Sequence, residues 1–346
     1  MSVGLLPELR VIDAGSVPAI RSQSLWHGLA STMGSTDRSV LSFCRPTEAY
    51  VCVVFHRRLN ELDLTACSEM ELPVLRRQIG GGPVYCDADQ LFFQITIPAD
   101  RAPASIDRLY QALLGPAAAA LRRLGLDARL ECINEIVVGD RKLSGTGAGR
   151  IGDAVTVVGN VIFRFPHARM ARVIALPAGA RAEFLQLLQR YVSSLEAEGL
   201  TDITVETATS LLVDAFAEAF ELKPVADQPT RQEKSAINSW ERRFRNEGWV
   251  RGPDPRATVA RTVKVKAGVW LVMADDGSIA VTATVIDGRV ERARVDAAGG
   301  RDLAEDLAAA LLHAPFTRAG LYGRLAGHGS AGRRLAEVLT PTTTLN

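Results

Sequence analysis

Hydrophobic residues gather in short runs over the first hundred positions, a pattern typical of β-strands. The runs are rich in β-branched and aromatic residues and span 40–44, 50–55 and 91–97. Turn-prone residues at 45–48 separate the first two runs, and Pro98 closes the third. The pattern therefore predicts strands joined by irregular connections.

Apolar residues then recur every three or four positions, which predicts helices. The first helix is expected to begin after Ser105, and Pro116 should kink or split it because proline removes a hydrogen bond and clashes with the preceding turn. Two amphipathic helices are predicted over 184–195 and 208–220, with Thr204 as the N-cap of the second.

Between these helical patterns lies a predicted β-hairpin. Its strands cover 133–138 and 141–145, and the turn is Gly139-Asp140. An apolar strand over 154–165 should follow. If 141–144 is extended, Lys142 and Ser144 point to one face of the hairpin.

The chain becomes polar and arginine-rich from 221 to about 252, and we interpret this segment as a tether between two domains. Beyond it, two Asp-Gly pairs at 276–277 and 287–288 predict a β-meander, followed by a helix near 302–313. We expect an α+β (α/β) fold, with a larger domain at 1–245 and a small α+β domain at 246–346.

Composition narrows the class of protein. The 346 residues are 47% hydrophobic and 23% charged, as in globular proteins, and the net charge of +1 favours neither nucleic acid nor a membrane surface. Five cysteines without a C-x-x-C pair argue against a zinc site or a disulfide framework. With no long apolar stretch at the N-terminus or elsewhere, we expect a cytoplasmic protein with no signal peptide and no membrane span.

The most informative segment reads Arg-Arg-Gln-Ile-Gly-Gly-Gly-Pro-Val-Tyr-Cys-Asp over 76–87. Three consecutive glycines disfavour regular structure, and bare backbone can approach a phosphate or carboxylate and present N–H donors. Neighbouring arginines add permanent positive charge. A glycine-rich surface turn is the alternative for this segment taken alone.

The second segment, Ile-Asn-Glu-Ile-Val-Val-Gly-Asp-Arg-Lys-Leu-Ser-Gly, covers 133–145. A lysine beside a glycine-rich loop can neutralise charge that develops during phosphoryl or acyl transfer. Asn134 and Glu135 offer an amide and a carboxylate suited to a nucleotide-bound Mg²⁺. An exposed hairpin lysine opposite a solvated carboxylate is the alternative.

Together the two segments resemble the signatures of the lipoate–protein ligase family, relatives of biotin–protein ligases. The family patterns R-R-x-x-G-G-G-x-V-x-x-D and N-D/E-hydrophobics-G-x-K-hydrophobic-S-G fit 76–87 and 134–145. The resemblance extends to Val158-Gly159-Asn160, to the two predicted helices before 221, and to an accessory domain over about 268–312.

This resemblance implies a two-step reaction, in which lipoate or octanoate and ATP form an acyl-adenylate that acylates a lysine of an apo lipoyl-carrier domain. Lys142 would contact the acyl carboxylate and the α-phosphate, and Asn134 and Glu135 would lie near Mg²⁺ and the triphosphate. The remaining implied substrate- and ATP-binding residues are Arg77, Gly80, Gly81, Gly82, Pro83, Val84, Tyr85, Asp87, Ser144 and Gly159.

The chain departs from the family pattern at several positions. Cys86 stands where the family has histidine, and Val158 and Asn160 replace histidine and threonine. We expect Cys86 to be a buried structural thiol because no base lies near it in the sequence. The alternatives are an ATP-independent octanoyl or lipoyl transferase, a biotin ligase, and a catalytically silent acyl- or nucleotide-binding protein.

Overall fold

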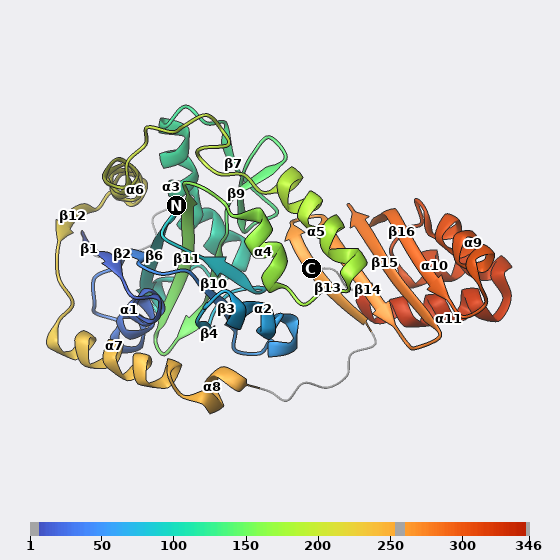
Figure 1. Cartoon of the computed structure of the whole chain (residues 1–346). Helices are drawn as coiled ribbons and strands as arrows, with labels where there is room; N and C mark the ends of the chain where they lie inside the picture. Colours follow the sequence, from blue (N-terminus) through green and yellow to red (C-terminus); the bar gives the residue numbers. More distant parts are fainter. Residues whose placement is uncertain (1–6, 253–259, 344–346) are drawn as a thin grey trace. The chain divides into compact units, whose positions relative to one another are not determined.

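The computed structural model describes residues 7–252 and 260–343. The chain divides into two compact units, Met1–Pro177 with Leu188–Pro255, and Ala178–Leu187 with Arg256–Asn346. Figure 1 shows the elements of both units, which are described here one at a time.

The first unit is built on a six-stranded mixed sheet. β1 pairs in parallel with both of its neighbours, and the other pairings are antiparallel. In spatial order the strands are β10 (Gly147–Ile151), β11 (Ala154–Ile162), β6 (Gln90–Pro98), β2 (Val40–Pro46), β1 (Glu8–Val17) and β12 (Lys223–Ala226).

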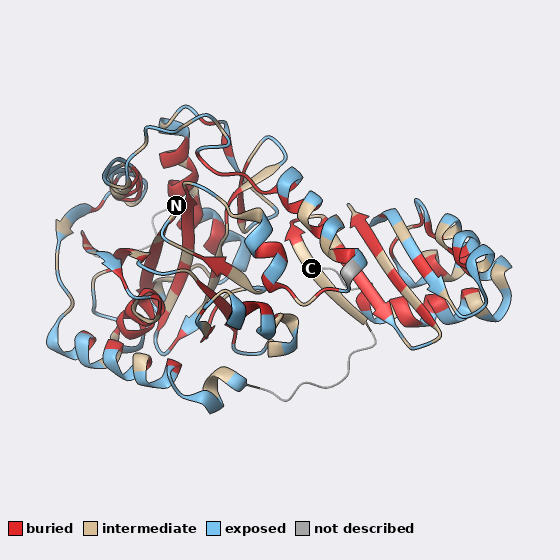
Figure 2. Cartoon of the chain, in the orientation of Figure 1, coloured by how far each residue is buried: buried red, intermediate tan, exposed pale blue. Residues whose placement is uncertain are grey.

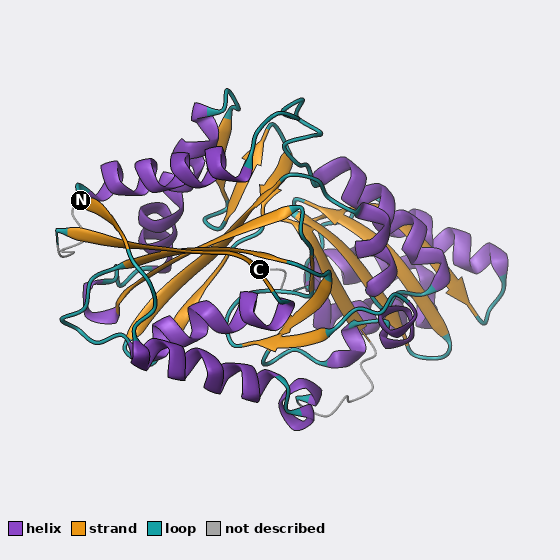
Figure 3. Cartoon of the chain, turned by 60° about the vertical axis from the view of Figure 1, so that its left-hand side comes forward, coloured by secondary structure: helices purple, strands orange, loops and turns teal. Residues whose placement is uncertain are grey.

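Helices cover both faces of this sheet (Figure 3). On one face α3 (Ile106–Arg123) and α6 (Val205–Phe220) enclose the larger apolar core with the alternate residues Leu91, Phe93 and Ile95 of β6. On the other face lie α1 (Ala19–Thr32) and α7 (Arg231–Phe244). The strands and the helix faces that meet them are buried (Figure 2).

Two three-stranded sheets carry the motifs. The first consists of β4 (Val74–Arg77), β3 (Tyr50–Val54) and β5 (Val84–Cys86). The second consists of β7 (Ala128–Glu131), β8 (Glu135–Val138) and β9 (Arg141–Ser144). Short helices complete the unit: α2 (Leu64–Glu69), α4 (His167–Val173) and α8 (Glu247–Arg251).

The second unit is a four-stranded antiparallel meander with three helices. Its strands are β13 (Ala260–Lys266), β14 (Val269–Asp275), β15 (Ile279–Ile286) and β16 (Arg289–Ala297). The helices that close its core are α9 (Arg301–Leu311), α10 (Arg318–Leu325) and α11 (Gly329–Leu339). The first half of α5 (Ala178–Tyr191) lies against the sheet, where Arg294 Nη2 donates to the Gly179 carbonyl at 2.6 Å.

The predicted fold class, a mixed α/β architecture, is confirmed, and so are the meander and the Thr204 cap, whose side chain accepts from the Thr207 N–H. Asp287-Gly288 is a two-residue turn with positive φ at both positions, whereas Asp276-Gly277 lies in a three-residue connection and Asp276 has no positive φ. Two predictions about helices are wrong. α3 runs through Pro116 without a break, so the predicted split is wrong, because apolar side chains on both sides of the proline pack into one core and offset the lost hydrogen bond; a kink there stays a prediction. The meander is followed by three helices, not one; the glycines within α10 and α11 weaken the helical signal in the sequence.

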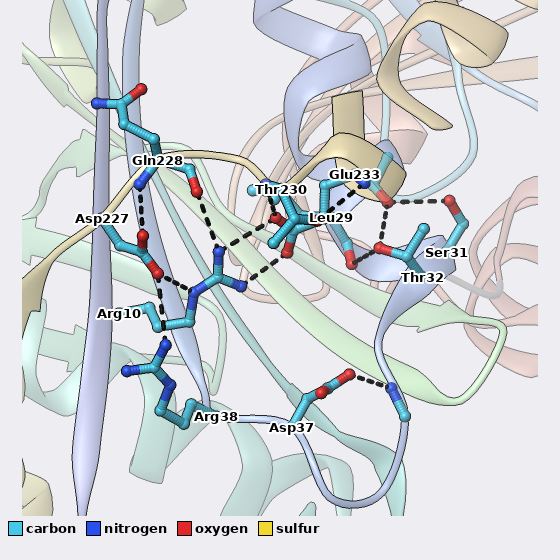
Figure 4. A network of polar contacts seen from close by, with 12 residues as sticks. Arg10, Leu29, Ser31, Thr32, Asp37, Arg38, Asp227, Gln228, Thr230 and Glu233 are labelled. Carbon is cyan, nitrogen blue, oxygen red and sulfur yellow. Dashed lines mark hydrogen bonds and ion pairs between the residues drawn. The ribbon is translucent and has the colours of Figure 1, made fainter. Parts of the chain in front are cut away.

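The polar tether predicted over 221–252 is also wrong for residues 223–251. Most of this segment is β12, α7 and α8, and α7 buries an apolar stripe of Ile237, Trp240 and Phe244. A capping box between Thr230 and Glu233 starts α7, and Arg10 of β1 binds Glu233 and Asp227 (Figure 4).

No helix in the ranges 7–252 and 260–343 is both long enough and apolar enough to cross a membrane. The division expected at 245/246 stays a prediction.

Candidate active site

The glycine-rich segment connects β4 to β5 and crosses directly over β10. Gly80 has φ +118°. A Cβ on Gly147 would lie 2.8 Å from Gly80 Cα, and one on Gly149 would lie 2.9 Å from the Ile79 side chain. Such distances are too short for real Cβ atoms, so only glycine permits the crossing. The structure thus brings the first motif onto the strand that follows the second.

Gly81 and Gly82 differ from Gly80. A Cβ on either would meet no other atom within 4 Å, and neither glycine has positive φ. Local packing therefore does not require these two glycines. Their exposed backbone leaves room for a ligand to approach, and the segment continues through the half-buried Pro83 and Val84.

Arg77 lies beneath this segment and determines its shape. Its guanidinium donates to the carbonyls of Ile79 at 2.8 Å, Cys52 at 2.9 Å and Gly82 at 2.9 Å. A Cβ on Gly80 would lie 2.7 Å from Arg77 Nε. Arg77 is buried. The sequence predicts contact between Arg77 and the adenylate; in this structure its donors hold the loop that would make that contact.

Arg76 points to the opposite face of β4 and is also buried. Its guanidinium donates to five backbone carbonyls, at distances from 2.6 to 3.2 Å, and burial lowers its pKa. Two of these carbonyls belong to Val250 and Arg251 of α8, and Trp249 Nε1 donates back to the Arg76 carbonyl at 2.8 Å. α8 therefore supports the strand that leads into the glycines.

A buried histidine supports the same segment from α1. His27 Nε2 accepts from the Gln78 N–H at 3.1 Å, so Nδ1 carries the proton and donates to the Gln23 carbonyl at 2.6 Å. Burial lowers the pKa of His27 to about 3. The ring packs against Trp26, Trp240 and Phe244 and stays neutral near pH 7.

Lys142 extends from β9 toward β8, where Glu135 lies opposite. Lys142 Nζ is 3.2 Å from Glu135 Oε1; the lysine side chain is 21% exposed and the glutamate side chain 2%. The buried Glu135 carboxylate orients the Lys142 ammonium. One side of the ammonium stays exposed, so a substrate anion can still bind it.

Asn134 follows an unusual turn. Cys132 and Ile133 both have positive φ, +44° and +64°, which is strained for a β-branched residue such as Ile133. The Asn134 carbonyl accepts from the Thr146 hydroxyl, and its side chain hydrogen-bonds the Tyr110 hydroxyl of α3. These contacts join Asn134 to the segment between β9 and β10.

The same residues can be tested as a metal site. In the described part of the chain, no three His, Cys, Asp or Glu side chains come together as metal ligands. Glu135 faces the ammonium of Lys142. The residues present therefore do not form a cage for a resident Mg²⁺, and the role of Glu135 near a nucleotide-bound ion stays a prediction.

The remaining site residues fall into two groups. Ser144, Tyr85 and Asp87 lie close to the motifs: the Tyr85 hydroxyl accepts from Arg169 of α4 at 3.1 Å, and burial raises the pKa of Asp87. Gly159 lies elsewhere. A Cβ there would be 2.4 Å from the Phe93 ring, so Gly159 makes room in the core beneath α3 and α6.

Cys86 is 2% exposed, and burial raises the pKa of its thiol well above the ordinary value. A protonated, inaccessible thiol is a poor nucleophile, in agreement with the expected structural role. Cys52 is buried nearby in the same apolar cluster with Tyr50.

Sequence reasoning missed several residues that build this site: His27, Arg169, Gly147 and Gly149. Alternating glycines immediately after the second motif, at 147 and 149, do signal a close backbone approach on a strand. His27 and Arg169 have no local signal, because only the tertiary fold brings α1 and α4 to the loop.

Comparison with known proteins agrees with this geometry. Residues 23–217, more than half of the chain, match the family described as "Lipoyl protein ligase A/B catalytic domain". "Lipoate-protein ligase A subunit 1" of Thermoplasma acidophilum is 23% identical over 62% of this chain and 86% of its own length. "Lipoate--protein ligase 1" of Staphylococcus aureus is 23% identical over 68% of this chain and 69% of its own.

Solved structures share the fold. The bi-partite lipoate protein ligase of T. acidophilum, from a study that includes its E2 lipoyl domain, has a TM-score of 0.65 at 19% identity and covers 74% of this chain and 100% of its own. A lipoate-protein ligase A bound with ATP gives 0.61 at 20% identity, covering 71% and 99%. LipL1 of P. falciparum in complex with lipoate gives 0.57 at 13% identity, covering 96% and 100%. With a family match over more than half its length and both signatures meeting at one place, the chain belongs to the lipoyl protein ligase A/B catalytic domain family.

Proposed function

We propose that this chain is an ATP-dependent lipoate–protein ligase. In the first step the carboxylate of lipoate or octanoate attacks the α-phosphate of ATP, forming acyl-AMP and releasing pyrophosphate. In the second step the ε-amine of a lysine on an apo lipoyl-carrier domain attacks the acyl carbonyl, forming an amide and releasing AMP with a proton. AMP is already a good leaving group, so the enzyme needs no covalent nucleophile.

The crossing of Gly80 over Gly147 carries this proposal. It places the open backbone of Gly81 and Gly82 beside the strand that continues from the Lys142 hairpin. The backbone of 82–85 would line the adenylate, with N–H donors at every position except Pro83, and the bare glycines would admit its phosphate. Neither motif alone offers both a phosphate-binding backbone and a partly exposed ammonium.

Lys142 would act on the reacting groups. Its ammonium, oriented by Glu135 and partly exposed, would contact both the acyl carboxylate and the α-phosphate. It would reduce the repulsion between these anions and stabilise the charge that develops on the phosphate during attack. Glu135 would keep the ammonium aimed at the site between turnovers.

The buried arginines would add positive electrostatic potential. Arg77 is satisfied by carbonyl oxygens and keeps its positive charge beneath the glycines, and Arg76 keeps its charge on the opposite face of β4. Carbonyl dipoles orient a guanidinium without cancelling its charge, so the loop favours a polyanion such as a triphosphate. We propose that Mg²⁺ arrives with ATP, and no step is assigned to a resident metal.

Two observations favour a ligase over an ATP-independent transferase. A solved relative of the same fold binds ATP. The chain also has no cysteine after Cys132, so it lacks a thiol beyond the Lys142 hairpin, and the thiol of Cys86 is buried. A cysteine-dependent acyl transfer of that kind would need an accessible thiolate after the hairpin, and the exposed thiol of Cys132 precedes it.

The test is the intact mass of an apo lipoyl domain incubated with the enzyme, lipoate and Mg-ATP. We expect a mass increase equal to lipoate minus water, together with release of pyrophosphate and AMP. An octanoyl carrier protein without ATP serves as the parallel donor. Acylation in that second reaction alone would identify a transferase, and acylation in neither would favour a silent binding protein.

The second unit completes the proposal: we infer that it serves adenylation. Truncation after Gly252 tests this better than truncation after Arg245, because the longer piece keeps the α8 carbonyls that bind Arg76. If the unit serves activation, the truncated chain loses pyrophosphate release but still transfers lipoate from supplied lipoyl-AMP. Both half-reactions unchanged would disprove the role.

A further inference from the structure

A chain of buried amides connects the two motifs through the middle of the first unit. Gln90 Nε2 donates to the Tyr85 carbonyl at 3.2 Å and to Asp87 Oδ1 at 3.4 Å. Gln90 Oε1 accepts from Asn160 Nδ2 at 2.9 Å. The connection therefore begins at the end of the glycine-rich motif and reaches β11.

The chain continues into the lysine motif. Asn160 Oδ1 accepts from the Gly145 N–H at 2.8 Å, and the Ser144 hydroxyl lies 3.5 Å from the same oxygen. The Asn160 N–H faces the Ser144 hydroxyl at 3.4 Å. Ser144 is two residues from Lys142 on the same short strand. Every amide oxygen and nitrogen of Gln90 and Asn160 thus has a partner.

These contacts join elements of three different sheets: β5, the pair β6 and β11, and β9. Gln90 is 2% exposed and Asn160 8%. Buried amides hold fixed distances because a misplaced one leaves an unsatisfied polar group. One glutamine and one asparagine therefore link the Tyr85–Asp87 segment to the Lys142 strand, which is also held by β8 and by the Ser193 N–H on the Lys142 carbonyl.

We propose that Gln90 and Asn160 are positioning residues for adenylation, which hold Lys142 at its working distance from the adenylate-binding segment. This inference rests on the proposed function and adds two residues that act only through others. Neither residue has to touch a substrate. A displacement of about 1 Å at a reacting group can lower a rate about 100-fold.

The first test compares two glutamines of the same strand. Gln90→Met removes the relay, and Gln94→Met is the matched control, since Gln94 is 1% exposed and bonds Ser42 but neither motif. Both variants should lose similar stability. We expect kcat for pyrophosphate release to fall about 10- to 100-fold in Gln90→Met only, with KM for ATP and lipoate changed less than about threefold. Equal kcat values in the two variants would overturn the proposal.

A second test asks whether the relay acts through Lys142. Asn160→Asp keeps the acceptor for Gly145 but turns a carboxylate oxygen toward Gln90 Oε1. In the wild-type background this should lower kcat at least about tenfold; in a Lys142→Ala background it should change the residual rate less than about threefold. An equal loss in both backgrounds would mean that Asn160 does not act through Lys142.

The same variant has a pH signature that a purely structural defect lacks. When the carboxylate introduced by Asn160→Asp gains a proton, it regains a donor toward Gln90, so the ratio of Asn160→Asp to wild-type kcat should rise as pH falls. The double variant Gln90→Asn with Asn160→Gln moves one methylene between the partners and should recover part of the lost rate. A flat pH ratio without such recovery would refute the relay even if Gln90→Met fails to fold.

The proposed function and the positioning role of Gln90 and Asn160 can fail independently. If Lys142→Ala keeps normal pyrophosphate release, the role of Lys142 fails whatever the amide variants do. If Lys142→Ala abolishes release while Gln90→Met and Asn160→Asp match Gln94→Met, only the relay fails.

Discussion

Two groups of buried arginines in the first unit are satisfied in opposite ways. Arg10 binds Asp227 Oδ2 at 2.6 Å and Glu233 Oε1 at 2.7 Å, so its charge is matched by carboxylates (Figure 4). Arg76 and Arg77 donate to backbone carbonyls. The pKa of Arg10 is raised above its usual value, chiefly by Glu233, whereas burial lowers the pKa of Arg76.

Arg10 has a structural role, whereas we propose that Arg77 helps to bind an anion. The Arg10 group neutralises itself and fastens α7 to β1, far along the chain from the motifs. Arg77, beneath the glycines, donates to carbonyls, so under the proposed function its charge stays available to an anion, because carbonyl dipoles provide hydrogen bonds without an opposite charge. Arg76, on the opposite face of β4, fastens α8 to the strand.

The largest effect is expected when the ion pairs of Arg10 are broken. Arg10→Met leaves Glu233 buried without its cation, and we expect the free energy of unfolding to fall by about 3–5 kcal/mol. kcat per folded molecule should not change. Urea unfolding measures the free energy of unfolding, and pyrophosphate release measures kcat. Adding Glu233→Gln to Arg10→Met should restore part of the stability, and no restoration would mean that charge is not the cause.

The second prediction concerns Lys142, where the main loss should be in activity. Lys142→Ala removes a preorganised charge and should lower pyrophosphate release about 10²- to 10³-fold, equivalent to about 3–4 kcal/mol of transition-state stabilisation. The Glu135 carboxylate, only 2% exposed, loses its cation, so the free energy of unfolding should fall as well, and pyrophosphate release is therefore compared per folded molecule. Near-normal release would remove Lys142 from the mechanism.

His27 and the carboxylates that bind Arg10 should lose their contributions to stability in different pH ranges. The pKa of His27 is lowered from 6.5 to about 3, so its contribution to stability is full above 6.5 and is lost as pH falls from 6.5 toward 3. Burial opposes ionisation of Glu233, yet the bonds from Arg10 and Thr230 outweigh it and hold the pKa below 4.5; Asp227 is also lowered, chiefly by Arg10. Their contribution is lost below about pH 4.5.

Unfolding free energies measured from pH 7 to pH 3 test this. His27→Gln should weaken the slope between pH 6.5 and 4.5, to which His56 also contributes because burial lowers its pKa, and Arg10→Met should weaken the slope below pH 4.5. If His27→Gln keeps the upper slope, the buried imidazole is not its source.

A smaller effect is expected at the loop crossing. Gly147→Ala places a Cβ 2.8 Å from Gly80 Cα, so the loop must move, and KM for ATP should rise about tenfold. Gly145→Ala is the control, since its Cβ would lie 3.7 Å from Asn160 Oδ1. Equal KM values for the two variants would show that the crossing does not position the nucleotide.

The smallest effect concerns the thiol. Cys86→Ser and Cys86→Ala should keep most of the adenylation and transfer activity, within about threefold, because a buried protonated thiol takes no part in attack on an adenylate. Trapping of an acyl group on Cys86, detected as a hydroxylamine-sensitive mass increase, would favour a transferase.

Local signals in the sequence predict the elements whose cause is local. Apolar runs rich in β-branched and aromatic residues predict β2, β3 and β6, a Gly-Asp turn predicts the hairpin of β8 and β9, and a capping residue predicts the start of α6 at Thr204. α1 carries no such signal: it is buried around most of its circumference, with Ser22, Gln23, Ser24 and His27 among its buried residues, so no amphipathic pattern marks it.

α7 shows the opposite difficulty. Its apolar stripe is sparse among many charged residues and reads as a solvated linker, although the capping box and the spacing of Ile237, Trp240 and Phe244 indicate a helix. At the site, the motifs predict which residues gather. They do not reveal that both arginines turn toward backbone carbonyls, or that Glu135 faces Lys142, because these depend on side-chain orientation across separate sheets.

The contact between Gly80 and Gly147 also bears on the order of folding. It joins segments far apart in the chain, and one of them, β10, is an edge strand that pairs only with β11 within its sheet. The glycine-rich loop has no support at this point until that edge is in place, and closing such a long loop is entropically unfavourable. We therefore expect the glycine-rich loop to order late, after the central strands, with φ-values near zero for substitutions at Gly147. The chain would then acquire its stability before the loop proposed to bind ATP takes its shape.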